Sequence, residues 1–407
     1  MKIAKDGVRS IVRIGYDGRV HKTFRGTGKK ERFANEVRVL RILEARGCEF
    51  VPRVLEADEE TLELVTTNCG SPAPQISKDK AEELFTTLEE TYGVVHDDPF
   101  PRNITYHRQM GKFCVIDFEL AKVLERRDGE ELTEVEQEQS RILDWCGLTR
   151  AGHKRKGNQD SLSVFASDQG WARSEERSGS RSIDEEALIF AVSDGMGGAA
   201  GGDIASNLVV SELRRFLPAM MGDFSQVGEP THILESAVKS LHEYVNRMAH
   251  RHEGMEEMGA TVVCGLFFRH WVYFAHVGDS RFYRYHGGTL KQLTFDQTYV
   301  GAQFRAGKLN EREARSHPAR NILNQAIGGL CQSVHPQVDE APIEKGDWFL
   351  ICSDGVIDGM WNKNLADAFA RGVEQDLTAE QVATGILEDA CEVSGRDDTT
   401  LFVIKVL

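Results

Sequence analysis

Residues 187 to 198 of this chain are Ala187-Leu188-Ile189-Phe190-Ala191-Val192-Ser193-Asp194-Gly195-Met196-Gly197-Gly198. The first six are apolar and predict a buried strand, and Asp194 follows where that strand ends. The glycines beyond it allow a tight turn and let a metal ion or a phosphate approach the backbone closely. The stretch therefore predicts an acidic ligand at the end of a core strand.

Four more aspartates repeat this pattern, each closing or following an apolar run: Asp160, Asp279, Asp354 and Asp397. Carboxylate oxygens are the ligands that Mg²⁺ and Mn²⁺ prefer. Two such ions about 3.5–4 Å apart can share a water, lower its pKa and direct it at phosphorus. A single Asp-Gly is more often an ordinary turn or helix cap, but five strand-end carboxylates together favour a metal site.

Composition limits the classes of protein that fit. Of 407 residues, 41% are hydrophobic, which is enough for two domains with cores of their own. The formal net charge of -15 argues against a nucleic-acid partner, because such a surface needs a basic face. Eight cysteines without a CxxC pair predict reduced thiols and a cytoplasmic protein. No apolar run reaches the roughly 18 residues of a membrane helix, and no signal peptide is recognisable, so we expect no membrane partner.

The chain is predicted to divide at a strongly charged segment. Residues 1–124 would form the first domain, 125–142 a charged linker, and 143–407 a second domain of α+β composition. In the second domain the apolar periodicity predicts helices at 202–217 and 232–251, and the polar stretch 174–186 is predicted to be a surface loop.

Residues 143–407 resemble a metal-dependent protein serine/threonine phosphatase of type 2C, the PPM family. Nine motifs occur in the family's order, among them Arg155 to Ser161, Asp194 to Gly198, Gly278 to Arg281 and Arg396 to Thr399. The resemblance implies a β-sandwich flanked by helices. It also implies hydrolysis of phosphoserine and phosphothreonine proteins with two Mn²⁺ or Mg²⁺ ions, and with a third ion bound more weakly.

The resemblance also assigns roles to individual residues. Arg155 would hold the substrate phosphate through its planar multi-donor fork. Residues 296–325 would form the flap that helps to select the phosphoprotein. The implied ligands are Asp160, Asp194, Asp354, Asp397 and the carbonyl of Gly195 for the two central ions, with Asp279 and Asp358 for the third.

Two positions depart from the family pattern. Gln159 stands where many members have Glu, so it keeps an oxygen but loses a charge, and its role toward the metal should be weaker or mediated by water. Met196 stands where some relatives carry a His proposed to protonate the leaving oxygen. Because Met cannot donate a proton, the general acid is left unassigned.

The first domain resembles the small atypical kinases of the lipopolysaccharide, RIO and aminoglycoside type, which implies a small protein-kinase-like α+β domain. The resemblance rests on His96-Asp97-Asp98, on Asn103 five residues after Asp98, and on the strand-terminal Asp117-Phe118. It implies an ATP-Mg site. The implied roles are catalytic base for Asp98, Mg²⁺ ligands for Asn103 and Asp117, phosphate-binding lysine for Lys22 and helix partner of that lysine for Glu36.

This domain departs from kinases in several ways. No Gly-rich loop precedes Lys22, Glu119 replaces the usual Gly, and hardly thirty residues separate Asp117 from the second domain. Two hypotheses stay open: a minimal kinase, or a nucleotide-binding pseudokinase. Either would regulate or oppose the phosphatase, with a separate partner kinase also conceivable. The alternative for the whole chain is a signalling scaffold with little turnover, and the sequence does not predict its oligomeric state.

Overall fold

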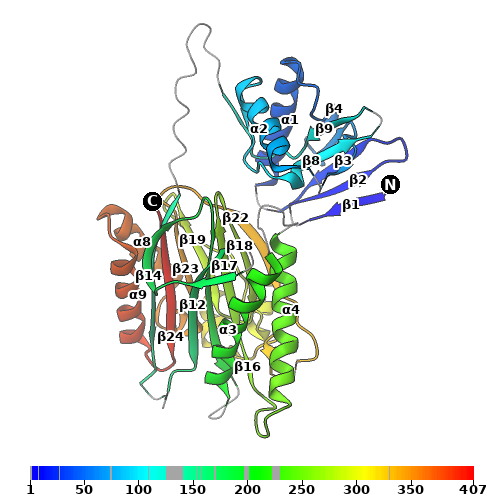
Figure 1. Cartoon of the computed structure of the whole chain (residues 1–407). Coiled ribbons are helices and arrows are strands. Elements are labelled where there is room, and N and C mark those ends of the chain that lie inside the picture. Colours follow the sequence, from blue (N-terminus) through cyan, green and yellow to red (C-terminus); the bar gives the residue numbers. More distant parts are fainter. Residues whose placement is uncertain are drawn as a thin grey trace. The chain divides into compact units, whose positions relative to one another are not determined.

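The computed structural model describes residues 2–7, 9–26, 28–73, 76–108, 110–124, 141–153, 155, 157–168, 171–196, 201–221, 230–329 and 331–407. These residues divide into two compact units, one ending at 124 and one beginning at 141 (Figure 1). The linker predicted at 125–142 lies outside the described residues except for its last two positions.

Two antiparallel sheets form the larger unit (Figure 1). The first runs in the order β14 (Ser178–Ser182), β11 (Ile142–Arg150), β24 (Thr399–Val406), β23 (Trp348–Cys352), β19 (Arg281–His286) and β20 (Thr289–Gln292). The second runs β13 (Trp171–Ser174), β12 (Asp160–Asp168), β15 (Ala187–Met196), β17 (Val262–Phe268), β18 (Trp271–Val277) and β22 (Gln337–Pro342). The short strands β16 (Gly259–Ala260) and β21 (Ile327–Gly328) extend the second sheet beside the end of β15.

The two sheets share one apolar core. Phe190 and Phe267 of the second sheet meet Phe402 and Phe349 of the first, edge to face, with ring centroids 5.3 and 5.2 Å apart. Such contacts add to the burial of large aromatic surfaces. The unit is therefore a sandwich, as the family resemblance implied for this domain.

Helices cover the outer faces of the sandwich (Figure 1). α3 (Gly202–Met221) and α4 (Pro230–Ala249) pack on the second sheet, while α7 (Asp354–Gly359), α8 (Asn362–Glu374) and α9 (Ala379–Val393) pack on the first. Because both faces of the central strands are buried, these strands are apolar at nearly every position, and every residue of β17 and β18 is buried. The predicted flap contains α5 (Tyr299–Arg305) and α6 (Glu311–Ser316).

The surface loop predicted at 174–186 is wrong at its centre, because Ser178–Ser182 form β14 and pair with β11 at the sheet edge. An edge strand whose side chains stay partly in solvent needs no apolar alternation, so Ser178-Gly179-Ser180-Arg181-Ser182 carries no hydrophobic signal. The helices predicted at 202–217 and 232–251 are present as α3 and α4, with shifted ends.

The smaller unit has a sheet in the order β1 (Lys2–Asp6), β2 (Ser10–Ile14), β3 (Val20–Phe24), β5 (Glu63–Thr66) and β4 (Val54–Asp58). Its helices α1 (Lys29–Ala45) and α2 (Lys78–Glu90) share a core that includes Leu40, Leu64 and Leu88. The remaining elements are β6 (Ser71–Pro72), β7 (Val94–Val95), the 3₁₀ helix η1 (Pro101–Asn103), β8 (Ile104–His107), β9 (Lys112–Val115) and β10 (Lys122–Val123).

The eight cysteines are free thiols, and seven of them are buried, which agrees with the reduced state predicted from their spacing. Among the described residues, no helix combines the length and the apolar character needed to cross a membrane.

Candidate functional site

The first two predicted ligands face each other across the second sheet of the larger unit. Asp160 is the first residue of β12, and the antiparallel register places it directly opposite Asp194 of β15. Thr261 fixes the backbone of Asp194 from the other side: its Oγ1 accepts the Asp194 N–H at 2.9 Å, and its own N–H donates to the Asp194 carbonyl at 2.8 Å. Asp194 lies near the end of its strand as predicted, whereas Asp160 begins its strand and does not follow an apolar run.

The next two aspartates follow the ends of one strand from each sheet. Asp279 lies two residues after the end of β18, and Asp354 lies two residues after the end of β23, where α7 begins. Ser353 joins this region to β12, because its hydroxyl donates to Asp160 Oδ2 at 2.7 Å. Strands far apart in sequence therefore deliver their terminal carboxylates to one place.

Two carboxylate oxygens at this place have no hydrogen-bond partner. They are Asp160 Oδ1 and Asp354 Oδ1, and both are buried. A buried acceptor left unpaired costs about 1–3 kcal/mol, and more when it is charged. Bound divalent cations would satisfy such oxygens, and carboxylates are the ligands that hard metals prefer, so the residues present fit a hard-metal site.

Burial and the neighbouring carboxylates also shift the pKa values of these aspartates. Burial raises the pKa of Asp160 to about 6, and Asp398 and Asp397 add to the rise while Ser353 opposes it. Burial also raises the pKa of Asp279 to about 7, with Asp296 adding to the effect. The pKa values of Asp194 and Asp354 lie well above the ordinary range because of burial first and then because of the other aspartates. Without a cation, these carboxylates repel one another.

These raised pKa values predict an unusual pH dependence for the stability of the metal-free protein. Asp160 and Asp279 keep their protons to higher pH when folded than when unfolded, where an aspartate titrates near 4. The folded state therefore binds more protons between about pH 4 and 7, and the free energy of unfolding should fall by a few kcal/mol as the pH rises through this window. Thermal unfolding with a chelator should give a higher midpoint at pH 5 than at pH 8.

Added Mn²⁺ should weaken or reverse this trend, because the metal binds the deprotonated ligands. A chelated protein that is more stable at pH 8 than at pH 5 would contradict the shared carboxylate site.

Gly195 permits a close backbone approach beside Asp194. A Cβ at this position would lie 1.9 Å from the carbonyl oxygen of Gly202 and 2.7 Å from that of Gln159. The N–H of Gly195 donates to the same Gln159 carbonyl at 3.1 Å. Only glycine fits here, which agrees with the sequence argument for this turn.

Arg155 and Asp397 form an ion pair in this structure, and Arg155 also donates to Gln159 Oε1. Burial works against the charged form of Arg155, but Asp397, Asp398 and Asp194 raise its pKa. Arg155, the residue predicted to bind the substrate phosphate, therefore lies against the aspartates of this site, and its side chain is about one-third exposed.

Asp358 lies one helical turn after Asp354 on α7, and its carboxylate pairs with Arg320 of the predicted flap at 3.0 Å. Its charge acts on both Asp279 and Asp354. All the aspartates predicted as metal ligands in the larger unit are thus brought into one electrostatic group.

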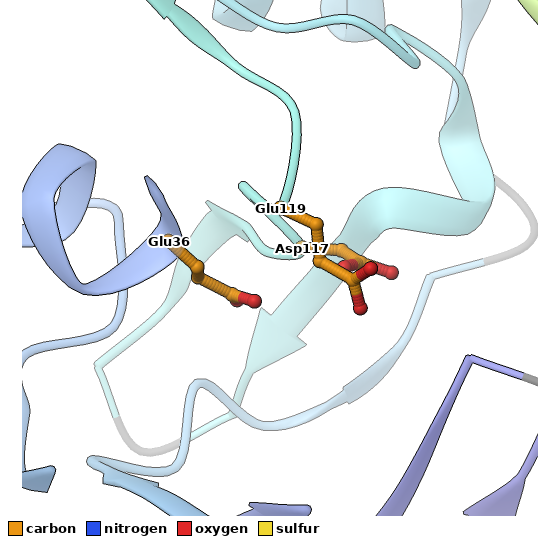
Figure 2. Close-up of side chains that lie close together, drawn as sticks. All are labelled: Glu36, Asp117 and Glu119. Carbon is orange, nitrogen blue, oxygen red and sulfur yellow. The ribbon is translucent and has the colours of Figure 1, made fainter. Parts of the chain in front are cut away.

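In the part of the chain that the structure describes, three carboxylate oxygens come within 4.8 Å of one another in only one group, Glu36, Asp117 and Glu119 of the smaller unit (Figure 2). Lys22 neutralises this group: its Nζ donates to Glu36 at 2.7 Å and to Asp117 at 2.6 Å, and lies 2.8 Å from Glu119. Arg32 pairs with Glu119 at 2.5 Å. We call these five residues the Lys22 cluster.

Burial disfavours the charged form of Lys22, but Asp117, Glu119 and Glu36 outweigh it and raise its pKa. Burial also raises the pKa of Glu36 to about 7, although Lys22 opposes the shift. The sequence predicted Lys22, Glu36 and Asp117 as one site, and the structure brings them together. It adds Glu119 and Arg32, which the sequence did not assign to it.

Asp98 and Asn103 lie together in the smaller unit. Asn103 Nδ2 donates to Asp98 Oδ2 at 2.7 Å, and Arg102 forms two further bonds with the same carboxylate, at 3.0 and 2.6 Å. The residue predicted as a catalytic base is therefore paired with a cation. Burial raises the pKa of its neighbour Asp97 to about 8, with the charge of Asp98 adding to the rise.

Comparison with known proteins places the larger unit in a family. The sequence model of the family described as protein phosphatase 2C matches residues 175–389, more than half of the chain. The serine/threonine protein phosphatase PstP of Mycobacterium tuberculosis is 31% identical over 221 residues, which are 54% of this chain and 41% of that protein. This chain thus spans less than half the length of PstP.

Protein phosphatase PhpP of Streptococcus pneumoniae is 28% identical over 261 residues, which are 64% of this chain and 96% of that protein. A crystal structure of the catalytic domain of PstP in complex with two manganese ions superposes with a TM-score of 0.52 and 26% identity. The match covers 66% of this chain and all of that domain. The α/β sandwich described above is the fold of these phosphatases.

Proposed function

Because the chain belongs to the protein phosphatase 2C family, we propose that it hydrolyses phosphoserine and phosphothreonine in proteins with the help of bound Mn²⁺ or Mg²⁺. The observation that carries the proposal is the group of strand-end aspartates with two buried, unpartnered carboxylate oxygens. The two manganese ions in the PstP structure support the choice of metal.

In this proposal the central ions are held by Asp160, Asp194, Asp354, Asp397 and the Gly195 carbonyl, and a third ion is held by Asp279 and Asp358. When bound, such ions lower the pKa of a water and offset the charge of the phosphoryl group. Arg155 exchanges its ion pair with Asp397 for the substrate phosphate, which it can bind with two parallel N–H donors. Met196 has no proton to give, so another group or water protonates the leaving alcohol.

A direct assay tests this function. The purified chain should release phosphate from a phosphothreonine peptide and from p-nitrophenyl phosphate when Mn²⁺ is present, and a chelator should stop the reaction. Failure with both substrates across Mn²⁺ and Mg²⁺ concentrations would overturn the proposal and favour a scaffold without turnover.

For the smaller unit we propose a kinase-like module that regulates the phosphatase. The support is the buried ion pair between Lys22 of β3 and Glu36 of α1, with Asp117 on the same ammonium group. In kinases a lysine and a helix glutamate pair in this way when the ATP site is in place.

The pseudokinase form of this module is favoured by two observations. Glu119 forms a further ion pair with Lys22, and Arg102 forms an ion pair with the carboxylate of Asp98. A nucleotide phosphate would have to displace one of three carboxylates from Lys22. ATP binding to the whole chain, measured by calorimetry with and without Mg²⁺, together with autophosphorylation, separates the cases. Turnover that is lost in Asp98→Ala and Asp117→Ala would show a kinase, and binding without turnover a pseudokinase.

A further inference from the structure

Asp398, the residue after the predicted metal ligand Asp397, is buried, with 2% of its surface exposed. Each of its carboxylate oxygens accepts a backbone N–H: Oδ1 from Gly152 at 2.9 Å and Oδ2 from Gln159 at 2.8 Å. Hydrogen bonds to an ionised acceptor are roughly twice as strong as neutral ones. A single side chain therefore holds both ends of the segment 152–159, which carries Arg155.

Further contacts attach this segment to the turn that precedes β24. The His153 N–H donates to the Gly395 carbonyl of that turn at 2.9 Å, and within the segment the Arg155 N–H donates to the Gly152 carbonyl at 3.0 Å. The backbones are so close that a Cβ on Gly152 would lie 2.5 Å from the Arg396 carbonyl oxygen. The position of Arg155 is thus set by the turn 395–398.

The neighbouring residue in that turn is Asp397, the predicted metal ligand that pairs with Arg155. Asp397 Oδ1 accepts the Asp398 N–H at 2.8 Å, so the two carboxylates are linked through the backbone. They have different partners: Asp397 contacts the phosphate-binding arginine, while Asp398 contacts only backbone amides among the bonds described above. One dipeptide therefore fixes the distance between a metal ligand and the arginine.

We propose that Asp398 is a positioning residue for the reaction, which holds Arg155 at the correct distance from the metal centre to receive the substrate phosphate. Each Asp398 oxygen is oriented by a backbone N–H, so we assign this carboxylate a positioning role and not a place among the metal ligands. It acts on substrate binding through Arg155, and the proposal rests on the phosphatase function proposed above.

The central test is Asp398→Asn. Asparagine keeps the size and one acceptor but turns an NH₂ group toward a backbone N–H, so one of the two bonds is lost. We expect kcat/KM for a phosphothreonine peptide to fall about 10- to 100-fold, as for other residues that orient a catalytic group. Most of the loss should appear in KM, and inhibition by inorganic phosphate should weaken by a similar factor. The Mn²⁺ concentration for half-maximal activity should change little, whereas Asp397→Asn should raise it strongly.

A double mutant tests whether Asp398 acts through Arg155. In an Arg155→Ala background, Asp398→Asn should cause almost no further loss, because the group that it positions is gone. Losses that multiply, or a raised Mn²⁺ requirement in Asp398→Asn, would overturn the proposal.

Gly152→Ala provides a second disruption of the same attachment, in case Asp398→Asn does not fold, and it should raise KM in the same way. If either folded variant keeps wild-type KM, the proposal is wrong although the phosphatase function stands. If the wild-type chain is inactive on both substrates, the proposed function itself has failed.

Discussion

Asp194→Asn should abolish phosphatase activity while the metal-free protein keeps or gains thermal stability. The loss should be about 10²–10³-fold or more, the range known for removing one electrostatic stabiliser of a transition state. The stability of the metal-free protein should not fall with activity. In the absence of metal the pKa of Asp194 is raised by burial and then by the charges of its neighbours Asp160, Asp354, Asp279 and Asp397. The asparagine removes one of these repelling charges.

The measurement is a pair of melting curves, with chelator and with Mn²⁺, alongside turnover of a phosphothreonine peptide. Wild type should gain stability from Mn²⁺ and the variant should gain less, since ligand binding to the folded state adds to stability. Asp367→Asn is a matched control, because Asp367 is exposed on α8. A fully active Asp194→Asn, or one that is destabilised only when metal is absent, would contradict the assignment of Asp194 as a ligand.

The core of the candidate site was predictable because its aspartates lie at the ends of apolar strands, a pattern that is visible in the local sequence. Asp160 and Asp194 stand at the ends of apolar strands, and antiparallel pairing then puts them opposite each other. Ser353 and Thr261 were not predicted, since their importance comes from contacts with Asp160 and Asp194 across the sheet. Local sequence contains no trace of such contacts.

The different roles of two adjacent carboxylates could not be predicted from the sequence either. Asp397 and Asp398 are chemically identical in the sequence, yet Asp397 faces Arg155 and Asp398 is buried against backbone amides. Both residues lie in the turn before β24, where no strand or helix period predicts which side chain faces the site. The ion pairs of Glu119 with Lys22 and Arg32 were not predicted either, because the sequence shows this residue only as a replacement for the usual glycine.

In the fold, the sandwich was implied by the resemblance to type 2C phosphatases, and α3 and α4 were predicted from helical spacing, whereas other elements were not predicted. The edge strand β14 is polar, and so it carries no hydrophobic pattern. Helices α8 and α9 were missed although α9 has a local start signal, a capping box between Thr378 and Gln381. A search for caps as well as for apolar periodicity would have found α9.

Lys22→Met should destabilise the smaller unit by about 3–5 kcal/mol, the usual cost of leaving buried charges without their partner. Lys22 contacts three carboxylates, and Arg32 also pairs with one of them, Glu119. The variant would leave Glu36 and Asp117 close together with the main counter-charge gone. Hydrogen exchange on the whole chain should show faster opening of peptides from α1 and β3, and little change in β15 or β24.

The pH dependence of the variant provides the decisive comparison. Burial already raises the pKa of Glu36 to about 7, and without Lys22 this pKa should rise further. The folded variant would then bind protons that the unfolded chain has released, so lowering the pH from 8 to 5 should restore much of its stability. Adding Glu36→Gln to Lys22→Met should restore part of it at pH 8, whereas Lys80→Met, which alters an exposed lysine of α2, should change nothing. If Lys22→Met is as stable as wild type, the Lys22 cluster is not needed for folding. The lysine would then be retained for a ligand, which would favour the nucleotide-binding form of this unit.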